Sequence, residues 1–225
     1  MSARKRSRPV KKQNMFEKKE MRLAITLIIA IIAIAAVIFS LYGNNNANNS
    51  SIVNNTNNQN NNSTTGNPTA IIDTSMGIIK VELYEDKVPN TVENFVKLAD
   101  DGFYDGLVFH RVIDNFVIQG GGYDTQGNLK ESPYGPIDLE INSELHHVDG
   151  AIAMARTSDP NSATSQFYIC DGTQSSLDGS YAVFGVVTDG MDVVRAIASV
   201  ETTTKHGMPD WPVEDVIINS ITIEQ

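Results

Sequence analysis

The chain has 225 residues, a formal net charge of −10 and a single cysteine. This length allows one domain of ordinary size, about 100 to 200 residues, together with an additional segment. A single cysteine excludes an internal disulfide, so any folded domain must be stable through its core alone.

The first 22 residues form a basic arm. They contain nine of the seventeen Lys and Arg residues and only two acidic residues, a local charge of +7, which leaves −17 for the other 203 residues. Such an arm is found in proteins that bind nucleic acid or anionic lipid, and also beside membrane spans. Because the acidic remainder repels phosphates, we expect no nucleic-acid partner.

Leu23 to Tyr42 is a run of twenty residues without a charged side chain. About 20 apolar residues, each rising ~1.5 Å in a helix, cross a hydrocarbon core of ~30 Å. A buried helix of a soluble protein would show a polar face, and a cleaved signal peptide has a shorter apolar region of ~7 to 15 residues. The run is therefore predicted to be an uncleaved signal anchor in the cell membrane. A cleaved, secreted form is the alternative.

The charge on either side of this anchor predicts its orientation. The basic flank stays in the cytoplasm by the positive-inside rule, so everything after Tyr42 is expected on the extracytoplasmic side. Residues 43–68 contain thirteen asparagines and almost nothing to bury, which predicts a flexible tether. Five N-x-S/T triplets lie in it, but an Asn-rich stretch contains such triplets by chance, so they indicate glycosylation only weakly; they begin at Asn48, Asn49, Asn54, Asn61 and Asn62.

Residues 69–225 are predicted to form one mainly β domain. One helix begins at Pro89 and ends near Gly102, and a second begins near Gly190. Many short strands with two helices indicate a closed antiparallel barrel of eight strands, capped by the helices. The strands read from alternation are 71–74, 78–84, 109–113, 116–118, 151–155, 166–170, 182–187 and 216–223.

The most informative stretch is the predicted hairpin from Phe109 to Gly122. Counting by twos places Phe109, Arg111 and Ile113 on one half-buried face. Burying a guanidinium costs several kcal/mol unless it is paired, so Arg111 either pairs with an internal carboxylate or is held for a ligand. The pattern alone favours the first, structural interpretation.

Several other features are interpreted as structural. The three glycines after Gln119 lack the lysine and the following helix of a phosphate loop, and so predict close backbone packing. The four histidines do not have the spacing of a zinc site, so we expect no metal. Cys170 alternates with strand residues and is predicted to be a buried, inert thiol.

Two motifs resemble those of the cyclophilins, the peptidyl-prolyl cis-trans isomerases. The first is F-H-R-V-I-x-x-F-x-x-Q-G-G, which begins at Phe109, and the second is S-Q-F-Y-I, which begins at Ser165. The resemblance covers roughly residues 70 to 225. It implies a cofactor-free isomerase that acts on proline-containing polypeptides. Together with the predicted anchor, this gives our first hypothesis, a membrane-tethered isomerase that assists the folding of exported proteins. We expect a monomer.

The resemblance also implies the site, residue by residue. Arg111 matches the catalytic arginine, and Gln119 matches a glutamine that orients it. The positions that match substrate-binding residues are Phe116, Val117, Ala155, Arg156, Gln166, Tyr168, Leu177 and Tyr181.

This chain departs from the eukaryotic pattern at two positions. Ser176 stands where those members have tryptophan, which argues against tight cyclosporin binding, and Tyr181 stands where they have a histidine. A second functional hypothesis is a non-catalytic module that uses the same groove to hold proline-containing segments. A pure binder would have no need of a guanidinium placed for a transition state, which favours the enzyme.

Overall fold

The computed structural model describes residues 66–225. The basic arm, the predicted signal anchor and nearly all of the Asn-rich segment lie outside these residues, so what the sequence predicts for them stays a prediction. Within residues 66–225, no helix is long and apolar enough to cross a membrane.

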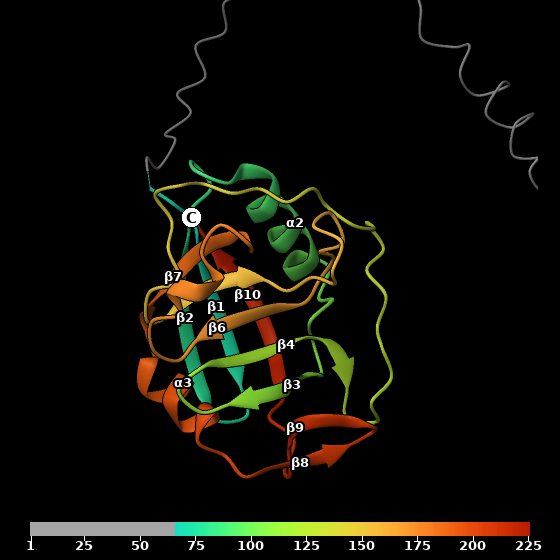
Figure 1. Cartoon of the computed structure of the whole chain (residues 1–225). Coiled ribbons are helices and arrows are strands. Elements are labelled where there is room, and N and C mark those ends of the chain that lie inside the picture. The colour runs from blue at the N-terminus through green and yellow to red at the C-terminus, as the bar shows by residue number, and fades with distance from the viewer. Residues whose placement is uncertain (1–65) are drawn as a thin grey trace, which may run out of the picture. The chain divides into compact units, whose positions relative to one another are not determined.

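The domain is built on one curled antiparallel sheet of eight strands (Figure 1). Along the sheet the strands follow the order β10-β1-β2-β7-β5-β6-β4-β3. In chain order they are β1 (Thr69–Thr74), β2 (Gly77–Leu83), β3 (Leu107–Ile113), β4 (Val117–Asp124), β5 (Ala151–Met154), β6 (Phe167–Cys170), β7 (Val183–Asp189) and β10 (Ile218–Glu224).

The prediction of a closed barrel is wrong, because the two edge strands of the sheet do not form a ladder. β3 and β10 meet only at an isolated bridge between Val108 and Ile217. Two hydrogen bonds flank it, from the amide of Gly106 to the carbonyl of Ile218 and from the amide of Phe109 to the carbonyl of Val216. Register shifts on both sides of Phe109 interrupt the pairing of β3 with β4, and such bulges bend a strand and disrupt its ladder. The sheet is therefore a half-barrel.

Two helices cover the main core, as the sequence predicts. Helix α2 (Pro89–Asp100) has proline in its first turn and is followed by Gly102, whose φ of +63° suits glycine. The carboxylate of Glu140 accepts a hydrogen bond of 2.8 Å from the backbone amide of Thr91. This bond satisfies one of the amides that have no partner within the first turn of the helix. Helix α3 (Met191–Ala198) buries Val194, Ile197 and Ala198.

The face of β3 on which Arg111 lies differs from the prediction. Phe109 pairs with Gly120, but Arg111 pairs with Gln119, so β3 contains one extra residue, His110, against β4. A single extra residue reverses the alternation of the strand. Phe109 is therefore buried in the main core, where its ring contacts Phe167, while Arg111 points to the opposite face.

The glycines of β4 allow this irregular pairing. Gly121 has a φ of +81°, and a Cβ on it would lie 3.0 Å from the backbone oxygen of Ser165. A Cβ on Gly120 would lie 3.1 Å from the backbone oxygen of Val108. The neighbouring chains thus approach to a distance that a side chain would prevent. This agrees with the prediction of close backbone packing.

A second, two-stranded sheet is present that the sequence pattern did not predict. It consists of β8 (Thr202–Lys205) and β9 (Met208–Pro212), joined by His206 and Gly207, which both have positive φ. Two such residues are typical of a type I′ hairpin turn. The prolines and the polar threonine run concealed the strands. β9 packs against β3, at the opposite end of the sheet from α2 (Figure 1).

His110 provides a test of this packing. Burial lowers its pKa to about 4, whereas an unfolded histidine titrates near 6.5. Between pH 6.5 and pH 4 the unfolded chain therefore binds a proton at His110 that the folded protein does not bind. The folded state loses stability relative to the unfolded state as the pH falls through this interval. We expect the free energy of unfolding, measured by urea denaturation, to fall by about 2 kcal/mol between pH 7 and pH 5.

The His110→Gln variant is the matched control, because glutamine keeps a polar side chain that does not titrate. It should lose little stability over the same interval, because it lacks the imidazole that takes up a proton on unfolding. An equal loss in both proteins would contradict the role of His110.

Candidate active site

A pocket of about 250 Å³ opens on the face of the sheet that bears Arg111. Nine of the ten residues predicted for the site line it. The tenth, Gln166, lines an adjoining pocket of about 390 Å³, which shares Gln119, Ala155 and Arg156 with the first. The structure thus brings together all ten: Arg111, Phe116, Val117, Gln119, Ala155, Arg156, Gln166, Tyr168, Leu177 and Tyr181.

The guanidinium of Arg111 has a neutral partner, Gln119, and a charged one, Asp210. One terminal nitrogen donates to Oε1 of Gln119 at 3.4 Å, and Nε2 of Gln119 donates in turn to Oε1 of Gln166 at 3.1 Å. Nε of Arg111 lies 4.0 Å from a carboxylate oxygen of Asp210 on β9. The two glutamines thus orient the guanidinium, and its remaining N–H groups are free to meet a ligand.

The pocket has an apolar wall formed by Phe116, Val117, Tyr168 and Leu177. Val117 and Tyr168 belong to a second buried cluster, which also includes Cys170. Burial raises the pKa of the Cys170 thiol to about 12, as expected for an inert thiol. The guanidinium carbon of Arg111 lies 5.7 Å from the ring centre of Phe116. A small apolar ring of a ligand bound against this wall would therefore lie beside a cation.

Tyr168 is fixed from behind by a buried histidine. Its hydroxyl lies 3.0 Å from Nε2 of His147, and Nδ1 of His147 lies 2.8 Å from the carboxylate of Asp178. The backbone amide and side chain of His147 hold the pKa of Asp178 at about 2, well below its usual range. The Tyr168 hydroxyl is thus bonded away from the pocket, so only its ring forms the wall.

Arg156 forms the boundary between the two pockets. Its guanidinium donates twice to the carbonyl of Ser180, at 3.0 and 2.8 Å, and once to the carbonyl of Thr157 at 2.9 Å. It also lies 4.7 Å from the ring centre of Tyr181. These contacts fix the side chain in one orientation along the groove.

Comparison with known proteins agrees with this geometry. Residues 69–223 match the model of the family "Cyclophilin type peptidyl-prolyl cis-trans isomerase/CLD". The chain belongs to this family. A peptidyl-prolyl cis-trans isomerase of Streptomyces antibioticus is 44% identical over 163 residues, which are 69% of this chain and 98% of that protein. Peptidyl-prolyl cis-trans isomerase B of Escherichia coli is 42% identical over 160 residues, or 68% of this chain and 97% of that protein.

A solved structure extends the likeness to the fold. The cyclophilin of Cryptosporidium parvum, crystallised in the presence of the dipeptide Ala-Pro, has a TM-score of 0.63 and 32% identity. The match covers 70% of this chain and 99% of the Cryptosporidium chain. The likeness therefore spans the domain that carries the pocket.

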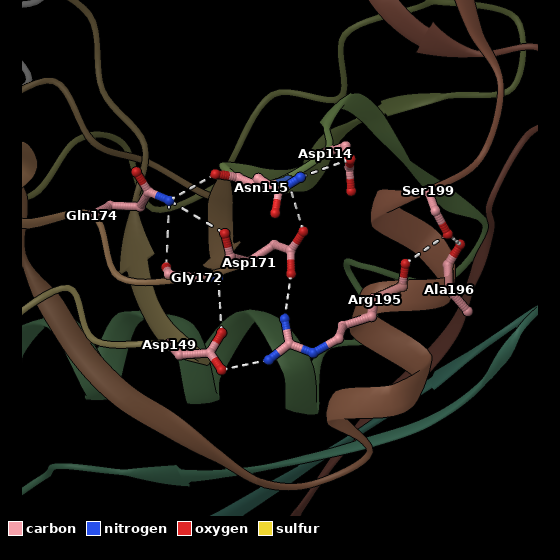
Figure 2. A network of polar contacts seen from close by, with 9 residues as sticks. All are labelled: Asp114, Asn115, Asp149, Asp171, Gly172, Gln174, Arg195, Ala196 and Ser199. Atoms are coloured by element: carbon pink, nitrogen blue, oxygen red, sulfur yellow. Dashed lines mark hydrogen bonds and ion pairs between the residues drawn. The ribbon is translucent and has the colours of Figure 1, made fainter.

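Within this cyclophilin-type domain, a polar network supports the turn that carries Phe116 (Figure 2). Asp171 directly follows β6. Its carboxylate accepts a hydrogen bond of 2.8 Å from the backbone amide of Asn115, and its own backbone amide donates to the carbonyl of Phe116. The guanidinium of Arg195, from α3, bridges Asp171 and Asp149. Asn115 has a φ of +56°, so these bonds hold a strained turn in place.

Three residues that contact the site residues or their turn were not predicted from the sequence: Asp210, His147 and Asp171. Each lies far along the chain from the residue that it contacts, and none belongs to a local motif. Asp210 was missed because its hairpin was not predicted. For His147 and Asp171 the sequence contains no signal, since their roles depend on the pairing of distant strands.

Asp171 tests the importance of this network. Its side chain is only 6% exposed and receives charge-assisted hydrogen bonds from Asn115 and Arg195. The Asp171→Ala variant should lower the free energy of unfolding, measured with urea, by about 2 to 3 kcal/mol. Asp114→Ala is the matched control, because Asp114 is exposed in the same turn; we expect it to change stability by less than about 1 kcal/mol. Equal effects would contradict the network's role.

Proposed function

We propose that residues 69–225 catalyse the cis-trans isomerisation of X-Pro bonds, with the proline ring in the apolar pocket and Arg111 acting on the prolyl amide. The observation that carries this proposal is the position of the Arg111 guanidinium, oriented by Gln119 beside Phe116 at the edge of that pocket. Family membership supports it. The domain acts as a monomer.

The chemistry of the bond explains why an arginine suits this reaction. The peptide bond resists rotation with a barrier of ~18–20 kcal/mol because its nitrogen lone pair is conjugated with the carbonyl. In the twisted transition state the proline nitrogen becomes pyramidal and regains its lone pair. A donor aimed at that nitrogen is bonded only in the transition state, which is the requirement for catalysis by differential binding.

The roles of the other residues follow from this step. The ring of Tyr168 and the side chains of Phe116, Val117 and Leu177 hold the proline ring and keep water from competing for the Arg111 donors. Gln119 and Gln166 hold the guanidinium in its productive orientation. Ala155 and Arg156 line the pocket, and we expect them to bond the main chain of the substrate. No covalent bond forms or breaks, so the reaction requires no cofactor.

The cellular setting is proposed from the sequence. The uncharged run Leu23 to Tyr42 anchors the chain in the cell membrane, the basic arm stays in the cytoplasm, and the isomerase domain is held outside on its Asn-rich tether. There the domain assists the folding of exported or cell-surface proteins. Uncatalysed proline isomerisation takes ~10 to 100 s and would otherwise slow their maturation.

The role of Arg111 is tested by peptide isomerisation kinetics. The Arg111→Ala variant should lower kcat/KM for a short X-Pro peptide by about 10²-fold or more, because a donor specific to the transition state is lost. Lys80→Ala, which removes an exposed cation from β2, should leave the rate unchanged. If the folded wild-type protein binds the peptide but leaves its isomerisation at the uncatalysed rate, the enzyme proposal is wrong and the groove is a peptide-binding surface.

The proposed topology has its own test. Protease added to intact cells that produce the full-length chain should cut the Asn-rich segment and release the domain from the membrane fraction. A variant with Ile31 and Ile32 replaced by arginine disrupts the apolar run and should leave the domain outside the membrane fraction before any protease is added. A domain that stays membrane-bound and uncut until the cells are lysed would show that it lies in the cytoplasm.

A further inference from the structure

Charge is distributed unevenly between the groove and the rest of the domain. Residues 66–225 contain 8 basic and 25 acidic side chains. The groove formed by the two adjoining pockets is nevertheless lined by three basic side chains, Arg111, Lys130 and Arg156, and by one acidic side chain, Glu131. A cationic groove thus lies within a strongly acidic domain.

The cations of the groove differ from the others in their partners. Elsewhere in residues 66–225, four of the remaining five basic side chains form ion pairs with carboxylates: Lys87, Lys97, Arg195 and Lys205. In the groove, Arg156 donates to the carbonyls of Thr157 and Ser180, and Lys130 donates to the carbonyl of Phe103. Carbonyl oxygens fix these cations without cancelling their charge.

Arg111 is only weakly neutralised. Its hydrogen-bond partner Gln119 is neutral, and its nearest carboxylate, that of Asp210, lies 4.0 Å away. The two side chains are 37% and 41% exposed, so solvent screens this pair. The groove therefore presents a net positive charge to whatever lies in it.

Distance decides which charges a bound peptide senses. At physiological ionic strength, interactions between exposed charges are screened beyond about 8 Å, so the acidic residues spread over the domain act weakly on a peptide in the groove. The cations that line the groove act within that distance, beside low-dielectric walls that strengthen their field.

We propose that this groove selects X-Pro segments with acidic side chains next to the proline and disfavours those with basic side chains, and that Arg156 is the main discriminating residue. The proposal rests on the proposed isomerase function. Arg156 lines both pockets and is held rigidly by Ser180, Thr157 and Tyr181, so little side-chain entropy is lost when it pairs with a carboxylate.

The test compares two peptides that differ only in charge, with the cores Glu-Ala-Pro-Glu and Lys-Ala-Pro-Lys. The kcat/KM of the full-length chain is measured for each at about 0.15 M ionic strength, after subtraction of each peptide's uncatalysed rate. We expect wild type to prefer the acidic peptide by about fivefold, which corresponds to a few partly screened charge pairs. Arg156→Gln should reduce this ratio about two- to threefold.

Two further variants separate charge from structure. Arg156→Lys keeps the cation and should retain most of the preference. Lys97→Gln removes a surface cation that is paired with Glu93 on α2, outside both pockets, and should leave the ratio unchanged.

The inference is overturned, and the isomerase retained, if wild type accelerates both peptides equally or if Arg156→Gln slows both by the same factor. If wild type accelerates neither peptide, the proposed isomerase function fails and the inference fails with it.

Discussion

The register of β3 against β4 is the constraint on which the site depends. The extra residue at His110 turns Phe109 into the main core and Arg111 toward the pocket, on the same face as Gln119 and Tyr168. Without this shift, the side chain of Arg111 would point into the main core with Phe109 and would need a buried carboxylate as a partner. The shift is accommodated on the β4 side, where Gly120 and Gly121 let the backbones of neighbouring segments approach closely. The position of Arg111 therefore depends on the glycines of β4.

The remaining parts of the site are held by contacts between segments that lie far apart in the sequence. The carboxylate of Asp171 fixes the turn before Phe116 and is itself tied to α3 by Arg195. His147 and Asp178 fix the ring of Tyr168, and Ser180 fixes Arg156. Most of these hydrogen bonds are made to the backbone or to the end of a side chain that faces away from the pocket. They therefore position the pocket walls without occupying the space for a ligand.

Sequence reasoning predicted those features that local pattern determines. Alternation located the strands of the large sheet, and Pro89 and Gly102 marked the limits of α2. Counting by twos failed at Arg111, because no local pattern reveals an extra residue in one strand of a pair. The prediction of a closed barrel was wrong for a related reason. Whether β3 and β10 pair depends on the bend of β3, which no local pattern reveals. The site residues came from resemblance to a family, whereas composition and spacing alone left Arg111 as a structural cation.

A crystal structure of the domain with a bound X-Pro peptide would test the central claim most directly. The account predicts the proline ring between Phe116, Val117, Tyr168 and Leu177, with the Arg111 guanidinium within hydrogen-bonding distance of the prolyl amide and still oriented by Gln119. A proline ring bound elsewhere, or an Arg111 side chain turned away from the peptide to pair with Asp210, would contradict it.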